Sequence, residues 1–228
     1  VVVTPWLRTQ GIATIDTLMV SHNDNDHSGG SDYLLAHFPI QELVTNQLVT
    51  NQVNNFEHLA TSTQLTVCVA GQTWVWDKVK FEVLNPLPNL QHEKKNNQAC
   101  VLRISNAAYS VLLTADIEQA AEQALLTEGA NLRANVVLVP HHGSKTSSSL
   151  PFLKAVTPKL AIVSSGYLNR FHHPHPKVIE RYESQGIKVL NTADTGAMQL
   201  DFSQEENQSP IIFTYRKQYA KFWNKRNN

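Results

Sequence analysis

The sequence has few cysteines, no excess of charge and no long apolar run, and each absence excludes a class of protein. Its 228 residues include only two cysteines, which excludes a dense disulfide framework. Lysine plus arginine equals aspartate plus glutamate at 19 each, which excludes nucleic-acid binding through overall charge alone. No apolar run approaches the ~18 residues of a membrane-spanning helix. A globular chain of one sizeable domain or two small ones is expected.

The two cysteines lie in separate apolar runs, Cys68 within residues 65–69 and Cys100 within residues 100–102. We expect small buried thiols, because free cysteine is among the most buried residue types. A disulfide between them is the alternative that the sequence leaves open. Neither cysteine has the paired spacing of a zinc-thiolate site.

Apolar periodicity predicts alternating strands and helices, with strands dominating toward the C-terminus. The clearest helix is 117–128, where apolar residues recur at helical spacing and Gly129 follows. Further helices are expected over 29–38, 150–156 and 176–185. Strands are expected over 17–20, 41–45, 65–84 (two or three strands), 100–105, 109–115, 135–139, 160–164, 187–191, 197–202 and 210–215.

The loop at residues 21–30 is the most informative segment. It reads Ser-His-Asn-Asp-Asn-Asp-His-Ser-Gly-Gly and directly follows the predicted strand 17–20. Its small residues allow a tight turn, so that His22, Asp24, Asp26 and His27 can converge on one point. Four titratable groups so close would perturb one another unless a cation joined them. Because imidazole and carboxylate bind Zn²⁺, Mn²⁺ and Fe, the loop predicts a metal site.

Two later segments place further candidate ligands directly after apolar strands. Asp116 follows residues 111–115, and His141 with His142 follows residues 136–140. Taken alone, Asp116 would be interpreted as a helix N-cap, with Gln119 completing a capping box. A lone histidine is usually a satisfied surface or core residue. Loops at one edge of a sheet cluster, however, so beside the His/Asp loop both segments are predicted to contribute ligands.

These motifs, taken in order, resemble the metallo-β-lactamase superfamily. The shared features are His-x-Asp-x-Asp-His-x-Gly-Gly at the opening loop, Leu-Leu-Thr-Ala-Asp at 112–116 and Val-Pro-His-His-Gly-Ser at 139–144. With residues 169–176 and 192–197 added, the chain resembles more narrowly the C-terminal nuclease-like domain of ComEC-type competence proteins, the DNA-uptake channels of bacteria. The resemblance implies an α/β (α+β) fold, the αββα metallo-β-lactamase sandwich.

The sequence departs from the superfamily pattern at several positions. Asp24 stands where most members have His, although ComEC-type domains share the Asp, and Ala115 replaces a family Gly. Asn96 and Asn97 occupy the place of the usual middle His, for which His92 is a weaker candidate. The chain begins at Val rather than Met, just upstream of the metal loop. We therefore expect a piece of a longer protein and a sandwich that could lack its first strands.

The resemblance implies two divalent metal ions. One would be held by His22 and Asp24 and the other by Asp26, His27 and His141, with Asp116 bridging them. Three carboxylates and three imidazoles favour Mn²⁺, with Zn²⁺ as the alternative. Two such ions would clamp a phosphate and lower the pKa of a water toward ~7.

Residues near these ligands are assigned to catalysis and substrate binding. The predicted catalytic residues are Asp26, His142 and His173. The predicted substrate-binding residues are Asn96, Asn97, Ser144, Lys145, Arg170 and His175. His173 would protonate the leaving oxygen, because histidine titrates near neutrality. The structural alternatives are a polar turn at 144–149 and a helix start at the Pro-His-Pro around His175.

By resemblance, the expected function is metal-dependent hydrolysis of DNA phosphodiester bonds, which degrades the non-transported strand during natural transformation. Residues 1–215 would form the domain. Residues 216–228 would form a basic and aromatic tail that binds single-stranded DNA or docks as a helix.

The expected partners are DNA and the membrane channel and other domains of the parent protein, with no stable oligomer evident. The expected location is a soluble domain of an inner-membrane protein on its periplasmic or extracellular face. Alternatives are a hydrolase of small esters, lactones or thioesters, and a non-catalytic DNA-guiding module.

Overall fold

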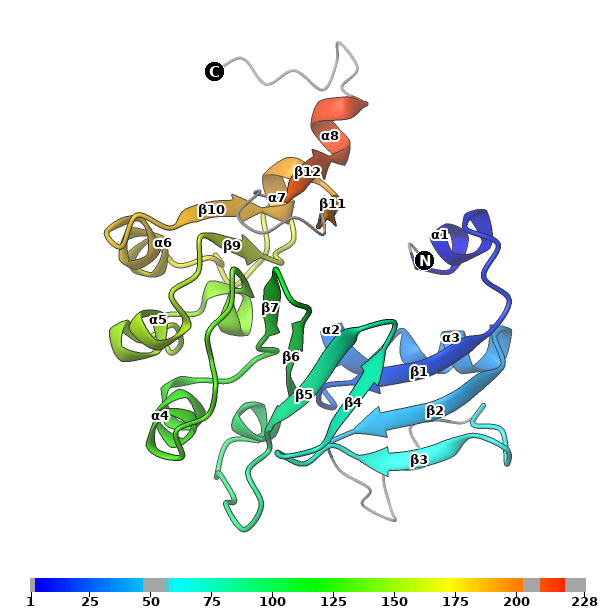
Figure 1. The fold of residues 1–228 in the computed structure, drawn as a ribbon. Coiled ribbons are helices and arrows are strands. Elements are labelled where there is room, and N and C mark those ends of the chain that lie inside the picture. The colour runs from blue at the N-terminus through cyan, green and yellow to red at the C-terminus, as the bar shows by residue number, and fades with distance from the viewer. Residues whose placement is uncertain (1–2, 47–55, 57, 203–209, 220–228) are drawn as a thin grey trace.

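The computed structural model describes residues 3–46, 56, 58–202 and 210–219. Two sheets pack face to face and helices cover their outer faces, as Figure 1 shows. This arrangement confirms the predicted αββα sandwich. None of the described helices is both long and apolar enough to span a membrane.

The larger sheet has seven strands in the order β10-β9-β8-β7-β6-β5-β4. They are β4 (Thr73–Trp76), β5 (Val79–Asn85), β6 (Val101–Ser105), β7 (Ser110–Leu113), β8 (Val136–Leu138), β9 (Leu160–Val163) and β10 (Lys188–Asn191). Strands β7 to β10 are parallel, whereas β4 to β7 are antiparallel. The carboxyl ends of β7, β8 and β9 therefore meet at one edge, where their loops cluster.

Parallel strands need crossover connections, and three helices supply them. They are α4 (Gln119–Thr127), α5 (Leu150–Val156) and α6 (Pro176–Glu183). The helices pack on the sheet through the main core, in which Leu112, Leu125 and Phe152 are fully buried. Burying each such side chain contributes about 1.5–3 kcal/mol.

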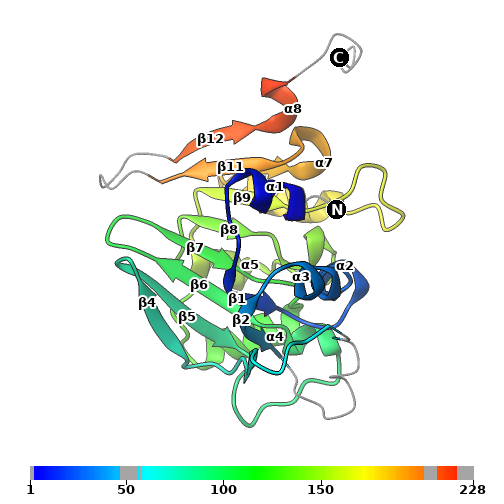
Figure 2. The same ribbon diagram turned by 90° about the vertical axis from the view of Figure 1, so that its right-hand side faces the viewer.

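The smaller sheet has three parallel strands, β1 (Ile15–Val20), β2 (Ile40–Thr45) and β3 (Gln64–Val67). Helix α3 (Ser31–His37) packs on it through Leu35, and Leu7 of α1 (Val3–Thr9) joins the same apolar cluster. The remaining elements are α2 (Asn25–Ser28), η2 (Lys95–Gln98), η3 (Pro140–Gly143), α7 (Thr192–Thr195), β11 (Met198–Asp201), β12 (Ile211–Thr214) and α8 (Tyr215–Gln218). In Figure 2, the antiparallel pair of β11 and β12 lies next to β9, at the top of the view.

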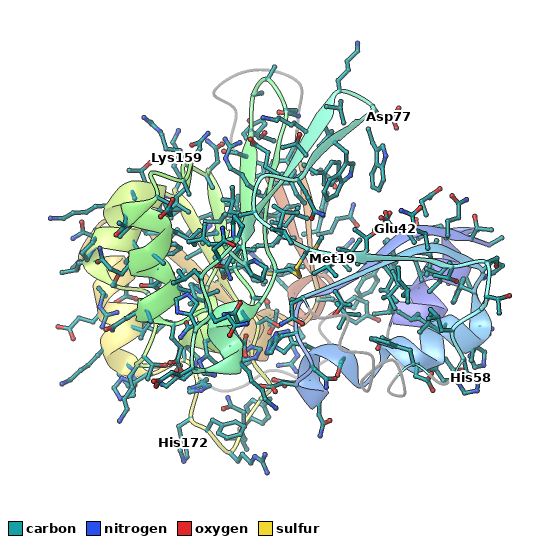
Figure 3. All side chains as sticks on the ribbon, turned by 90° about the horizontal axis from the view of Figure 1, so that it is seen from below. Met19, Glu42, His58, Asp77, Lys159 and His172 are labelled. Atoms are coloured by element: carbon teal, nitrogen blue, oxygen red, sulfur yellow. A yellow bond between two sulfur atoms is a disulfide. The ribbon has the colours of Figure 1, made fainter. Side chains whose placement is uncertain are left out.

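Cys68 and Cys100 form a disulfide, so the preferred expectation of free thiols was wrong although both residues are buried. The Cys68 amide donates to the Thr45 carbonyl at the end of β2, and the Cys100 amide donates to the Ser21 carbonyl, at 2.9 Å each. The bridge therefore joins the two sheets where the His/Asp loop begins. Figure 3 shows the sulfur atoms near Met19 of β1.

Several local predictions need correction. The helix predicted over 117–128 begins later, since α4 spans Gln119–Thr127 with Glu118 as its N-cap, so the alternative of Asp116 as a cap does not hold. Helix α1 was not expected. Only the beginning of the proposed tail is seen, as α8, and residues 220–228 lie outside the described part of the chain.

Candidate metal centre

Loops from both sheets meet at one point. The loop after β1 supplies Asp26 and His27, the loop after β7 supplies Asp116, and η3 after β8 supplies His142. One ligand atom from each of these side chains lies within 4.8 Å of the others. Imidazole nitrogens and carboxylate oxygens gathered in this way form a candidate divalent-metal site.

Unusual backbone geometry aims these side chains. Ala115, His141 and His142 have φ values of 48°, 49° and 54°, in the left-handed region that non-glycine residues rarely adopt. The His141 amide donates to the Ala115 carbonyl at 3.0 Å and links the two strained loops. Such strain gathers at functional sites. The left-handed backbone also explains why a glycine suits position 115, where this chain has Ala.

His142 has the orientation of a metal ligand. Its Nδ1 lies 2.6 Å from the Ser164 carbonyl oxygen, which can only accept, so Nδ1 carries the proton. In the neutral ring this leaves Nε2 with a lone pair, and this atom lies 3.1 Å from Asp26 Oδ2 and 3.5 Å from Asp116 Oδ2. Metal-ligating histidines typically donate their other N–H in this way.

The opening loop presents its two histidines to the same carboxylate. His27 Nε2 lies 3.1 Å from Asp116 Oδ1. His22 is 1% exposed, and its Nε2 has no hydrogen-bond partner, while Asp24 and Asp116 oxygens lie 3.6 and 3.8 Å away. Ser21 Oγ lies 3.1 and 3.3 Å from the Nδ1 atoms of His22 and His27. A buried nitrogen without a partner is costly, and a cation between it and the carboxylates would remove that cost. The donor set therefore fits a second divalent ion beside the first.

The charges of the site shift its titration. Burial opposes ionisation of Asp116, but the hydrogen bond from His27 and the charges of His142 and His27 outweigh it and lower the pKa of Asp116. Burial lowers the pKa of His22, and the charge of His27 adds to that effect. Burial also opposes protonation of His27, yet Asp116 raises the pKa of this imidazole. The lowered pKa values favour the metal-binding forms of Asp116 and His22, whereas the raised pKa of His27 favours its protonated form.

The family model of the metallo-beta-lactamase superfamily matches residues 5–167, more than half of the chain. The chain belongs to this superfamily. Its resemblance to competence proteins is also confirmed. It is 36% identical to "Recombination protein 2" of Haemophilus influenzae over 88% of this chain and 24% of that protein. It is 32% identical to "Competence protein ComA" of Neisseria gonorrhoeae over 96% of this chain and 30% of that protein.

Among solved structures, the metallo-beta-lactamase fold protein YhfI from Bacillus subtilis aligns with a TM-score of 0.53 at 12% identity, covering 91% of this chain and 82% of that one. This likeness concerns the fold alone. The chain spans about a quarter to a third of the length of the curated relatives named above.

The superfamily resemblance assigned His141 to the second ion, but the structure groups its neighbour His142 with Asp26, His27 and Asp116. His141 Nε2 lies 3.9 Å from Asp116 Oδ2 and 3.4 Å from the Asn96 amide nitrogen. Its Nδ1 lies 3.5 Å from Glu118 Oε1. His141 thus borders the site between Asp116 and Glu118.

Other predicted substrate-binding residues have structural partners. Asn97 is 2% exposed, and its Oδ1 accepts from the Glu118 amide at 2.8 Å. Ser144 is buried, with its Oγ 2.9 Å from Thr146 Oγ1. Lys145 is exposed and lines a pocket of about 740 Å³ together with His92. His92, the weaker candidate for the usual middle His, does not belong to the His/Asp cluster found among the described residues.

The three predicted residues of the loop after β9 differ in placement. His175 is the N-cap of α6, with Nδ1 accepting from the Lys177 amide at 3.2 Å, which is the structural alternative. His173 is half-buried beside the site, its ring 5.9 Å from that of His141. Burial and the charge of His141 lower the pKa of His173, which disfavours the protonated form that a proton donor needs. Arg170 is exposed.

Sequence reasoning missed the residues that hold the histidine loop. Glu122 of α4 is fully buried and accepts from the Ser148 and Ser149 amides, and Arg181 of α6 donates to the Ser147 and Ser148 carbonyls. A charged residue inside a helical pattern is usually solvated, so nothing local marks Glu122. Only the packing of α4 on the loop explains it.

Proposed function

We propose that this domain hydrolyses phosphodiester bonds of DNA with two divalent metal ions. One observation carries the proposal, namely the convergence of Asp26, His27, Asp116 and His142 donor atoms within 4.8 Å. The site is also open to a polymer, since the side chains of Asp24 and Asp26 are 48% and 62% exposed. The similarity to proteins named for recombination and competence supports DNA as the substrate.

In this proposal each residue has a defined task. His22 and Asp24 would hold one ion, Asp26, His27 and His142 would hold the other, and Asp116 would be available to both. Bound ions of this kind supply Lewis acidity and an activated water for attack on phosphorus. Ser164 fixes the tautomer of His142 through its carbonyl, and Glu118 faces Nδ1 of His141. Three carboxylates in the set favour Mn²⁺ over Zn²⁺.

The proposed setting is the outer face of the bacterial inner membrane, as part of a longer competence-type protein. The Cys68–Cys100 disulfide supports this location, because disulfides persist in oxidising compartments and are rare in the cytosol. Degradation of the strand that is not transported is the role that this location suggests.

The test compares DNA cleavage by the metal-depleted protein after addition of Mn²⁺, Mg²⁺ or Zn²⁺. We expect Mn²⁺ to restore cleavage most strongly, and Asp116→Asn to lower it by at least about 100-fold together with the metal content. Asp77→Asn is the matched control, because Asp77 lies at the end of the molecule opposite the loop of His172 in Figure 3. Metal-independent cleavage, or full activity of Asp116→Asn, would contradict the proposal.

A further inference from the structure

The loop between β9 and α6 exposes large apolar side chains beside the metal centre. Phe171 is 62% exposed, Tyr167 52% and Leu168 83%. We call residues 167–172 the aromatic loop. It protrudes from the body of the molecule at the right of Figure 2, where the ribbon is yellow, and Figure 3 places His172 at the edge of the view. Clustered exposed apolar side chains mark an interaction surface.

The residues directly after the aromatic loop, Pro174 and His175, are fixed against the metal-site loop. The His175 amide donates to the Gly143 carbonyl at 2.8 Å. Gly143 has a φ of +83°, and a Cβ at this position would lie 2.5 Å from Pro174 Cβ. Only glycine allows this close approach of the two loops. The segment that leads out of the aromatic loop is therefore held against the metal-site loop by backbone contact.

A series of rings leads from the aromatic loop to the site. The Phe171 ring stacks on the His173 ring, with centroids 5.8 Å apart and planes inclined by 20°. The His173 ring lies 5.9 Å from that of His141, which borders Asp116. The rings thus connect Phe171 to the border of the metal site in two steps, through His173 and His141.

Positive charge accompanies the exposed ring. The Arg170 guanidinium lies 4.6 Å from the centroid of the Phe171 ring, an arrangement that favours a cation over a π face. An exposed aromatic ring with an adjacent arginine suits a polyanion whose flat bases are accessible. In a duplex the bases are stacked inside and cannot reach such a ring.

We propose that the aromatic loop binds an unpaired nucleotide of single-stranded DNA, with the base packed against the exposed part of the Phe171 side chain and its phosphate paired with Arg170. This inference rests on the proposed function and specifies the substrate as single-stranded. Membrane surfaces also accept aromatic and apolar side chains. The ring series toward the metal site favours nucleic acid, because a membrane contact would gain nothing from that connection.

The first measurement is the affinity for a fluorescent oligothymidylate of about ten nucleotides, a typical single-strand site size. Chelator is present, so that no cleavage occurs. We expect Phe171→Ala to weaken binding about tenfold, since stacking contributes about 1–3 kcal/mol per base. Phe171→Trp should retain the affinity of the unaltered protein. Trp76→Ala is the control, because Trp76 is 46% exposed and lies next to Asp77 at the far end of Figure 3.

A double-mutant cycle then identifies the stacked base. One abasic position in the oligonucleotide should weaken binding to the unaltered protein and have no further effect on Phe171→Ala. Independent effects at every position would overturn the proposal. The proposal would also be overturned if Phe171→Ala lost binding to anionic vesicles but kept its affinity for the oligonucleotide, because that result would identify a membrane surface. Coupling without any cleavage in the metal assay would refute the hydrolytic function alone, and no oligonucleotide binding at all would refute both.

Discussion

Reduction of the Cys68–Cys100 disulfide should destabilise the domain substantially. The bridge closes a loop with a sequence separation of 32 residues. In the chain-entropy model, a loop of that length lowers the entropy of the unfolded chain by about 12 cal/mol/K, which corresponds to about 4 kcal/mol at 25 °C. For a chain of this size, such a loss lowers Tm by about 8–16 °C.

The measurement is thermal unfolding in metal-free buffer with and without reductant. Reduced protein retains both sulfur atoms in the core, so the comparison isolates the cross-link. The double variant Cys68→Ala and Cys100→Ala is the control, and its Tm should not respond to reductant. A shift of less than about 2 °C on verified reduction would refute the reasoning, because the loop entropy would then be offset within the unfolded chain.

Three further predictions follow from other contacts. His142→Ala should lower the bound metal by about one equivalent in elemental analysis, whereas His141→Ala should keep more of its bound metal than His142→Ala does. Equal losses of metal from the two variants would contradict the grouping of His142 with the cluster. Ala115→Gly should raise the free energy of unfolding by about 0.5–1 kcal/mol in urea titrations, because glycine accepts the left-handed backbone without strain. Burial opposes ionisation of Glu82, but hydrogen bonds from Lys80 and Arg103 outweigh this effect and lower the pKa of Glu82. The ionised carboxylate therefore stabilises the fold above the ordinary carboxyl pKa, and this stabilisation is lost as the pH falls through the lowered pKa. Glu82→Gln should therefore reduce the loss of stability in acid, and an unchanged pH profile would contradict this linkage.

Local signals in the sequence predicted the helices best. Helix α5 occupies residues 150–156 as expected. Ser149 caps it by accepting from the Phe152 amide, Pro151 lies in its first turn, and Thr157 ends it in the left-handed conformation. These determinants act within a few residues, so a sequence contains them in full. Helix α1 was missed because it is short and Thr4 is its only buried residue, which leaves no apolar stripe to detect.

Long-range features could not be predicted in the same way. The disulfide depends on how the segment after β3 meets the segment before β6, and those segments belong to different sheets. The choice between His141 and His142 depends on two left-handed residues in succession, a conformation that the surrounding packing imposes. Sequence order placed both histidines at the site but could not determine which imidazole turns toward Asp26.

The origin of the ligands explains why the contact between the two sheets matters for the chemistry. The loop after β1 of the smaller sheet supplies Asp26 and His27, whereas Asp116 and His142 follow strands of the larger sheet. No single layer therefore holds a complete site. The sheets are held together by a small apolar cluster that includes Val44, Val83 and Leu102 and by the adjacent disulfide. A cavity in this cluster should disturb metal binding before it unfolds the main core, since the ligands move with their sheets while the helices keep their own packing.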